Sequence, residues 1–197
     1  MDKFDLSIIS DLILSKGLKA TTMDDVANAL TISKRTLYER YPSKNKLIKE
    51  VIDYWQKIHR AKIETIMRES NEMMEAYYHA FTFHHTSMLS VNPRFYQDLE
   101  IFYPDARGEF DKHKIERDSK FLRCIHKGIE QGVFRESMNY LIVLKLLDLQ
   151  YEAIKRMEVS MGLDINLPET FRGLKICFLR SIATSKGMEI LDKLCDI

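Results

Sequence analysis

Helical periodicity runs through this chain almost from end to end. Apolar residues recur at spacings of three and four, as on one face of an α-helix, and no sustained alternation of apolar and polar residues indicates a strand. Only seven glycines and four prolines occur in 197 residues, so long stretches contain no helix breaker. The pattern predicts an all-α chain of about nine or ten helices. Breaks are expected at Gly17, Pro42, Asn92, Pro93, Pro104, Gly108, Gly132, Gly162 and Pro168.

Composition excludes several other classes of protein. Apolar residues make up 45% and charged residues 30% of the chain, with a net charge of +1, which is ordinary for a globular protein. No apolar run reaches the length of a membrane span, and acidic residues near the N-terminus do not fit a signal peptide. Three widely spaced cysteines favour neither a disulfide framework nor a zinc site. We therefore expect a cytoplasmic protein with Cys124 and Cys177 in its core and Cys195 exposed.

Positive charge is concentrated in one short segment. Residues 1–30 carry a net charge of −2, residues 31–62 carry +6, and the rest of the chain carries −3. Most charge runs are simply solvated helix faces. Here the basic segment coincides with two short helices that are expected to pack together, so a contact with nucleic acid is favoured over a solvated helix face.

Residues 22–41 have the pattern of two short helices joined by a tight turn. Thr22 and Asp25 have the spacing of a capping box, and Ser33 is a good N-cap for a second helix from Lys34 to about Tyr41. Leu37 and Tyr41 are four residues apart and point inward. A helix with hydrogen-bonding residues on its other side fits the major groove of DNA. Its candidate contacts are Ser33, Lys34, Arg35, Thr36 and Tyr38.

Pro42 ends this second helix, and Ser43 can cap the next one. The first turn of that next helix contains Lys44 and Lys46. A cation beside the positive end of a helix is unfavourable for the helix alone. It becomes favourable when an anion docks on the exposed N–H groups, so Lys44 is expected to contact a phosphate.

The segment GLKATTMDDVANALTISKRTLYERYPSKNKLIKEVI, residues 17–52, resembles the DNA-binding region of TetR-type bacterial transcriptional regulators. The resemblance covers about the first quarter of the chain. It implies that Thr22 contacts a phosphate, that residues 33–36 form the leading edge of the recognition helix, that Tyr38 touches backbone or base, and that Lys44 touches a phosphate.

Three positions depart from the family pattern. Thr31 replaces the usual glycine, so a left-handed backbone there would be strained or the turn would differ. Glu39 and Arg40 replace common aromatic and histidine residues, so base preference cannot be transferred.

The domains expected are a helix-turn-helix DNA-binding domain at 1–48 and a helical ligand-binding and dimerisation domain at 49–197. Aromatic residues and methionines gather after residue 73, and each is either core or cavity lining. The candidate ligand-binding residues are Tyr77, Phe81, His84, Met88, Phe102 and Phe121. The spacing of His79, His84 and His85 spreads these side chains around a helix, so no metal site is expected. No cofactor is expected either.

Two later helices, at 138–159 and 168–184, carry broad apolar surfaces. Leu141, Leu144, Leu147, Tyr151 and Ile154 should share one face of the first. Phe171, Leu174, Phe178 and Ile182 should share one face of the second. Burial within one chain is the simpler interpretation, and a four-helix bundle shared by two copies is the favoured one.

These features together predict a ligand-responsive transcriptional regulator. It should act as a homodimer on a palindromic DNA operator, as a repressor released by a small apolar or aromatic effector. Because no catalytic motif occurs, we do not expect an enzyme. The alternative is a helical small-molecule-binding protein or enzyme that keeps the fold without reading DNA. Neither function predicts a membrane partner.

Overall fold

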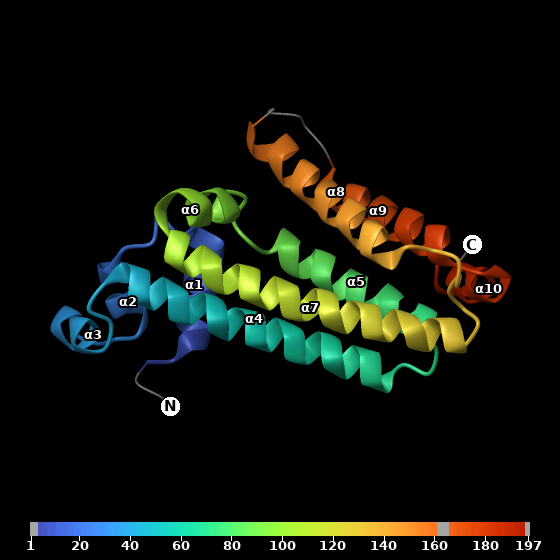
Figure 1. Ribbon diagram of the computed structural model, residues 1–197. Helices are drawn as coiled ribbons and strands as arrows, with labels where there is room; N and C mark the ends of the chain where they lie inside the picture. Colours follow the sequence, from blue (N-terminus) through green and yellow to red (C-terminus); the bar gives the residue numbers. More distant parts are fainter. Residues whose placement is uncertain (1–3, 161–165, 196–197) are drawn as a thin grey trace. The chain divides into compact units, whose positions relative to one another are not determined.

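The computed structural model describes residues 4–160 and 166–195 and, within them, ten helices and no strand (Figure 1). The expected all-α class and helix number are confirmed. The helices are α1 (Leu6–Lys16), α2 (Met23–Ala29), α3 (Lys34–Arg40), α4 (Lys44–Glu69), α5 (Met73–Leu89), α6 (Phe95–Phe102), α7 (Pro104–Glu130), α8 (Tyr140–Ser160), α9 (Leu167–Ile182) and α10 (Ser185–Leu194).

The expected break at Gly108 is wrong, because α7 runs through it without interruption. Gly108 is exposed, and a glycine inside an exposed helix costs only about 1 kcal/mol relative to alanine. Gly132 does end α7: its φ is +70°, and the amide of Val133 donates to the carbonyl of Gly128 at 2.9 Å. That bond is one half of a Schellman motif, in which a left-handed residue closes the helix.

The chain forms two compact units. The first comprises Met1–His59 and Ser90–Ile115, and the second comprises Arg60–Leu89 and Glu116–Ile197. These units do not test the expected boundary between a DNA-binding domain at 1–48 and a ligand-binding domain at 49–197, which stays a prediction.

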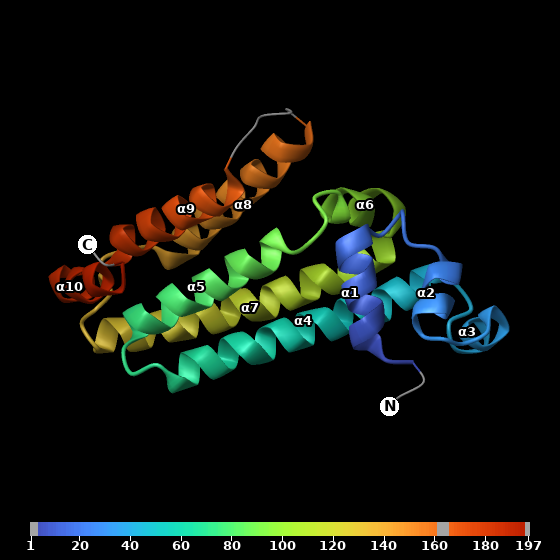
Figure 2. The same ribbon diagram turned by 180° about the vertical axis from the view of Figure 1, so that it is seen from behind.

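The first unit is built around α1, α2, α3 and the beginning of α4. Its core side chains are fully buried and come from every one of these helices; they include Ile9, Ile13, Val26, Leu37, Tyr41, Leu47 and Ile52. Leu37 and Tyr41 are each 0% exposed, which confirms the inward face predicted for the second short helix. In both views α2 and α3 lie next to each other (Figures 1 and 2).

The second unit packs α5 against α9 and α10, and α8 runs beside α9 (Figures 1 and 2). Its core includes Met74, Tyr77, Phe134, Leu179, Ile182 and Leu191. The segment after α7 is tied to the end of α9, since the amide of Arg135 donates to the carbonyl of Ile182 at 2.9 Å. The face predicted for α9 is confirmed, with Phe171, Phe178 and Ile182 buried and Leu174 half-buried.

Candidate nucleic-acid interface

The turn between α2 and α3 is a complete Schellman motif with Thr31 in its left-handed position. The φ of Thr31 is +56°, and Thr31 is the only non-glycine residue with positive φ in the described part of the chain. Its amide donates to the carbonyl of Asn28 at 3.0 Å, and the amide of Ile32 donates to that of Ala27 at 3.0 Å. These are the two bonds of the motif. The turn therefore keeps the geometry that glycine would give, and threonine bears the strain.

Thr22 caps α2 in the predicted capping box. Its backbone N–H donates to Asp25 Oδ2 at 2.7 Å, and the amide of Asp25 donates to Thr22 Oγ1 at 3.1 Å. The ammonium of Lys16 lies 2.7 Å from the same carboxylate. The hydrogen bond from Lys16 and the two from Thr22 hold the pKa of Asp25 well below its usual range. Thr22 is exposed, and its hydroxyl donates to Asp25 Oδ2 at 2.8 Å, so a contact with a phosphate would replace that hydrogen bond.

Ser33 caps α3 in the same way. Its Oγ accepts from the amide of Thr36 at 3.0 Å and lies 2.8 Å from the Thr36 hydroxyl. Both residues were predicted as DNA contacts. In the structure their hydroxyl groups also fix the start of the helix that carries Lys34, Arg35 and Tyr38.

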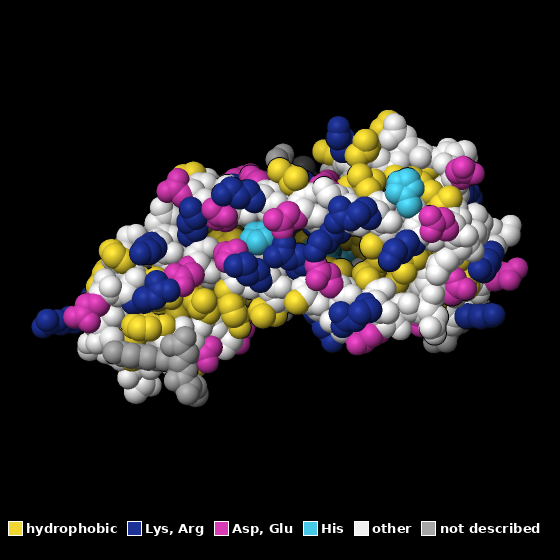
Figure 3. All heavy atoms as spheres, turned by 60° about the horizontal axis from the view of Figure 1, so that its bottom comes forward, with side chains coloured by type: hydrophobic (Ala, Val, Ile, Leu, Met, Phe, Trp, Pro, Cys, Tyr) yellow, Lys and Arg dark blue, Asp and Glu magenta, His cyan; other side chains and the backbone are white. Residues whose placement is uncertain are grey.

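The cations of α3 are each paired with a carboxylate. The ammonium of Lys34 lies 2.7 Å from Asp24 of α2, which raises the pKa of Lys34, and Arg35 lies 3.2 Å from Glu39. Arg40 pairs with Glu50 of α4. Figure 3 shows basic and acidic side chains interleaved over the face in view. Each cation of α3 therefore has a carboxylate beside it.

Lys44 stands at the start of α4 in a different environment. Its ammonium donates to the carbonyl of Lys19 at 3.3 Å and lies 5.6 Å from the centre of the Tyr103 ring. Among the described residues, no carboxylate lies within 4 Å of it. The Oγ of Ser43 caps this helix, since it accepts from the amide of Lys46 at 3.2 Å. An anion at this helix end would meet Lys44 without displacing an acidic side chain.

The structure brings together only some of the predicted ligand-binding residues. Tyr77 donates its hydroxyl to the carbonyl of Phe121 at 2.8 Å, and the two rings pack edge to face at 5.2 Å. Phe81 packs on Tyr77 from the next turn of α5. These three form part of the core of the second unit.

Of the other three predicted ligand-binding residues, two lie in the second unit and one lies in the first. Met88 is half-buried against the core of the second unit, and the half-buried ring of His84 lies 5.4 Å from the Tyr151 ring. Phe102 belongs to the first unit, where the ammonium of Lys19 lies over its ring.

His85 is the buried histidine of α5 that sequence reasoning passed over in favour of His84. It is 5% exposed, stacks on Phe171 at 5.0 Å and bonds to the Tyr151 hydroxyl. Burial, with a smaller contribution from the charge of Lys175, lowers the pKa of His85 to about 4. Lys175 is also buried, and it donates to Thr82 Oγ1 at 2.9 Å. His85 follows Phe81 by four residues, as Phe81 follows Tyr77, so helical spacing was the signal that could have placed it on the buried face.

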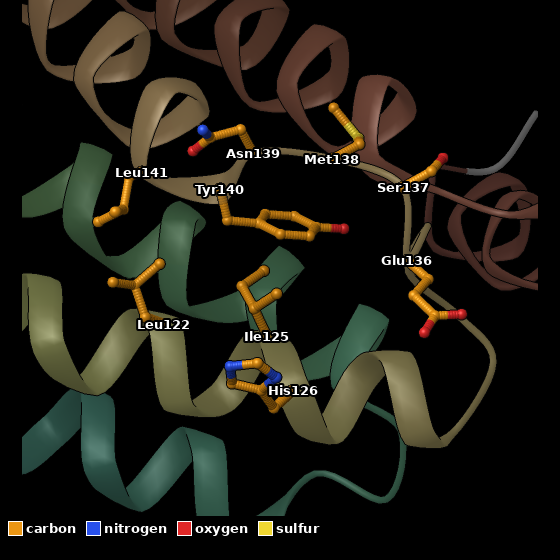
Figure 4. Close-up of a pocket in the computed structure, with 9 residues that line it drawn as sticks. All are labelled: Leu122, Ile125, His126, Glu136, Ser137, Met138, Asn139, Tyr140 and Leu141. Carbon is orange, nitrogen blue, oxygen red and sulfur yellow. The ribbon is translucent and has the colours of Figure 1, made fainter.

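A cavity of about 570 Å³ opens on the second unit between α7 and the start of α8 (Figure 4). Leu122 and Ile125 of α7 face Tyr140 and Leu141 across it. The polar side chains of its lining are His126, Glu136, Ser137 and Asn139. None of the predicted ligand-binding residues lines this cavity, which is formed by α7, the segment that follows it and the start of α8.

One side of α8 presents apolar side chains to solvent. Ile142, Leu146 and Leu149 are 54%, 55% and 64% exposed. Of the five residues predicted to share one face of α8, Leu144, Leu147, Tyr151 and Ile154 are buried, whereas Leu141 is 58% exposed. The prediction that Cys177 lies in the core is wrong, because it is on an exposed face of α9. Cys124 and Cys195 are each half-buried, so Cys195 is less exposed than expected.

The geometry is that of an all-helical protein whose N-terminal helices form a helix-turn-helix. Residues 9–51 match the family described as "Bacterial regulatory proteins, tetR family". The N-terminal region is therefore similar to that of the bacterial regulatory proteins of this family. No curated protein matches the sequence. In the part of the chain that the structure describes, every helix falls short of the length or apolarity needed to cross a bilayer.

Solved structures share the fold across nearly the whole chain. A TetR-family regulator from Agrobacterium tumefaciens is 14% identical, with a TM-score of 0.74 over 92% of this chain and 98% of that one. A regulator from Saccharomonospora viridis in complex with choline is 16% identical, with a TM-score of 0.75 over 91% and 95%. FadR from Bacillus subtilis in complex with stearoyl-CoA is 11% identical, with a TM-score of 0.68 over 88% and 95%. The chain has the fold of the TetR-family transcriptional regulators.

Proposed function

We propose that this protein is a ligand-responsive transcriptional repressor that binds a palindromic operator as a homodimer. The observation that carries the proposal is the helix-turn-helix itself. Its turn has both Schellman bonds, and α3 turns Leu37 inward and leaves Arg35 and Tyr38 exposed. A helix of this kind fits a major groove. The site comprises Thr22, Ser33, Lys34, Arg35, Thr36, Tyr38 and Lys44.

The homodimer is supported by the exposed stripe Ile142, Leu146 and Leu149 on α8. Leucine and isoleucine side chains in a row lose contact with water only if another surface covers them. A second copy offers the same stripe, so a two-fold axis can bury both at once. Two copies also present two α3 helices, which matches a palindrome of two half-sites.

The effector is expected to be a small apolar or aromatic molecule held in the second unit. The cavity beside Tyr140 has an apolar floor of Leu122, Ile125 and Leu141. Similar folds hold choline in one relative and stearoyl-CoA in another, so the fold accommodates unlike ligands. Release from DNA requires only that the effector bind one of two conformations better, with a coupling of about 1–3 kcal/mol.

The test is selection of bound duplexes from a random pool, followed by titration of the selected operator at several salt concentrations. Lys44→Ala should weaken binding to every duplex and lower the salt slope by about one ion. Lys57→Ala is the matched control, since Lys57 is on the same helix but paired with Asp53. Selection of no common sequence would contradict DNA reading. An unchanged slope in Lys44→Ala would contradict the phosphate contact.

A further inference from the structure

Arg35 and Glu39 occupy the side of α3 opposite its buried face. Each residue of an α-helix turns the side-chain direction by about 100°, so residues two before and two after Leu37 both point about 160° away from it. Leu37 is 0% exposed, whereas the side chains of Arg35 and Glu39 are 91% and 64% exposed. If α3 lies in a major groove with Leu37 inward, these two side chains reach deepest toward the bases.

Glu39 differs from the other carboxylates that pair with the cations of this helix. Asp24 and Glu50 reach Lys34 and Arg40 from α2 and α4. Glu39 is on α3 itself, one turn after Arg35, and its carboxylate lies 3.2 Å from the Arg35 guanidinium. The outward edge of α3 is therefore a cation and an anion side by side.

A carboxylate in a major groove restricts the bases that it can face. The groove edges of guanine and thymine present acceptors, which repel it. Adenine presents its N6 donor beside the N7 acceptor, whereas cytosine presents the N4 donor alone. Cytosine is thus the one base that offers Glu39 a donor without an adjacent acceptor, and every other base is disfavoured to some degree.

The spacing of the pair also suits neighbouring base pairs. Four residues of α-helix advance about 6 Å, and one base step advances about 3.4 Å. Arg35 and Glu39 therefore reach base pairs one or two steps apart when α3 runs along the groove. A guanidinium pairs with the two acceptors of a guanine.

We propose that Glu39 is a specificity-determining residue, selecting a cytosine in each half-site, and that Arg35 reads a guanine one or two base pairs away. This inference rests on the proposed function, because it requires that the protein read DNA. It assigns the base preference to Glu39, one of the positions at which the sequence departs from the family pattern.

The experiment compares the duplexes selected from a random pool by the wild-type homodimer and by Glu39→Gln. The wild type should prefer cytosine at one position of each half-site by about tenfold or more. Glutamine pairs best with adenine, so Glu39→Gln should move the preference at that position to adenine. Glu50→Gln is the control, because it removes the same charge from an ion pair with Arg40. It should tighten all duplexes about equally and keep the cytosine.

The outcomes separate two failures. If the wild type selects no common sequence, the proposed function fails, and the inference with it. If the wild type selects an inverted repeat but Glu39→Gln selects the same one, DNA reading stands and the role of Glu39 is refuted. Thermal unfolding of both variants should match the wild type, since the substituted side chains are at the surface of the unit.

Discussion

Replacing Thr31 with glycine should make the protein more stable, because threonine pays for a backbone conformation that glycine adopts freely. Thr31 has a φ of +56° at the left-handed position of the turn between α2 and α3. The same motif ends α7, where the left-handed residue is Gly132 with a φ of +70°. The chain thus contains the strained and the relaxed form of one motif.

The size of the gain follows from two opposing effects. An L-residue with a Cβ loses about 1–2 kcal/mol in the left-handed region, which glycine recovers. Glycine in turn gives the unfolded chain more freedom, at about 0.4–1 kcal/mol. The net gain is about 0.8 kcal/mol. For a chain of this length, that raises Tm by about 2–3 °C.

The assay is thermal unfolding followed by circular dichroism at one fixed protein concentration. Amide exchange of Ile32, which donates to Ala27, should slow by about fourfold in Thr31→Gly. Ala20→Gly is the control: Ala20 is exposed in a loop without positive φ, so the same substitution type should lower Tm. If Thr31→Gly also lowers Tm, the strain assigned to Thr31 does not exist.

Two further substitutions test the second unit. Leu149→Glu should shift the homodimer to monomer in analytical ultracentrifugation. The control, Thr86→Glu at an exposed site of α5, should remain a dimer. If both variants remain dimers, the dimer interface does not include this face of α8. His85, with a pKa of about 4 against an ordinary 6.5, stays neutral when folded, so stability should fall by up to about 3 kcal/mol as pH falls from 6.5 to 4. His85→Gln should remove most of this pH dependence of the free energy of unfolding, measured with urea. If the wild type and His85→Gln show the same pH dependence between pH 6.5 and 4, the low pKa of His85 is refuted.

Local sequence signals predicted the first unit well. Thr22 and Asp25, Ser33 and Thr36, and Leu37 and Tyr41 interact within a few residues of one another, so their spacing alone carries the information. The sequence located the turn at Thr31 but left its conformation open, because a β-branched residue disfavours the left-handed region that this turn adopts.

Features that depend on distant segments were beyond the sequence. Leu141 and Leu144 differ by less than one helical turn, and only the neighbouring helices decide which of them is covered. The cavity beside Tyr140 arises where the segment after α7 returns over α7 itself. The salt bridges of Lys34 and Arg40 join separate helices, so the sequence could not show which carboxylate would lie beside each cation.

Those salt bridges bear on how quickly a duplex would be found. Long-range attraction accelerates association only when a surface presents uncompensated charge. With carboxylates beside Lys34, Arg35 and Arg40, α3 itself adds little long-range attraction to DNA, and the dependence of the association rate on ionic strength should come mainly from cations without a carboxylate, such as Lys44. Selectivity would then arise after contact. Each cation exchanges its carboxylate for a phosphate or a base, and the protein dissociates most slowly from the duplex on which these new contacts are strongest.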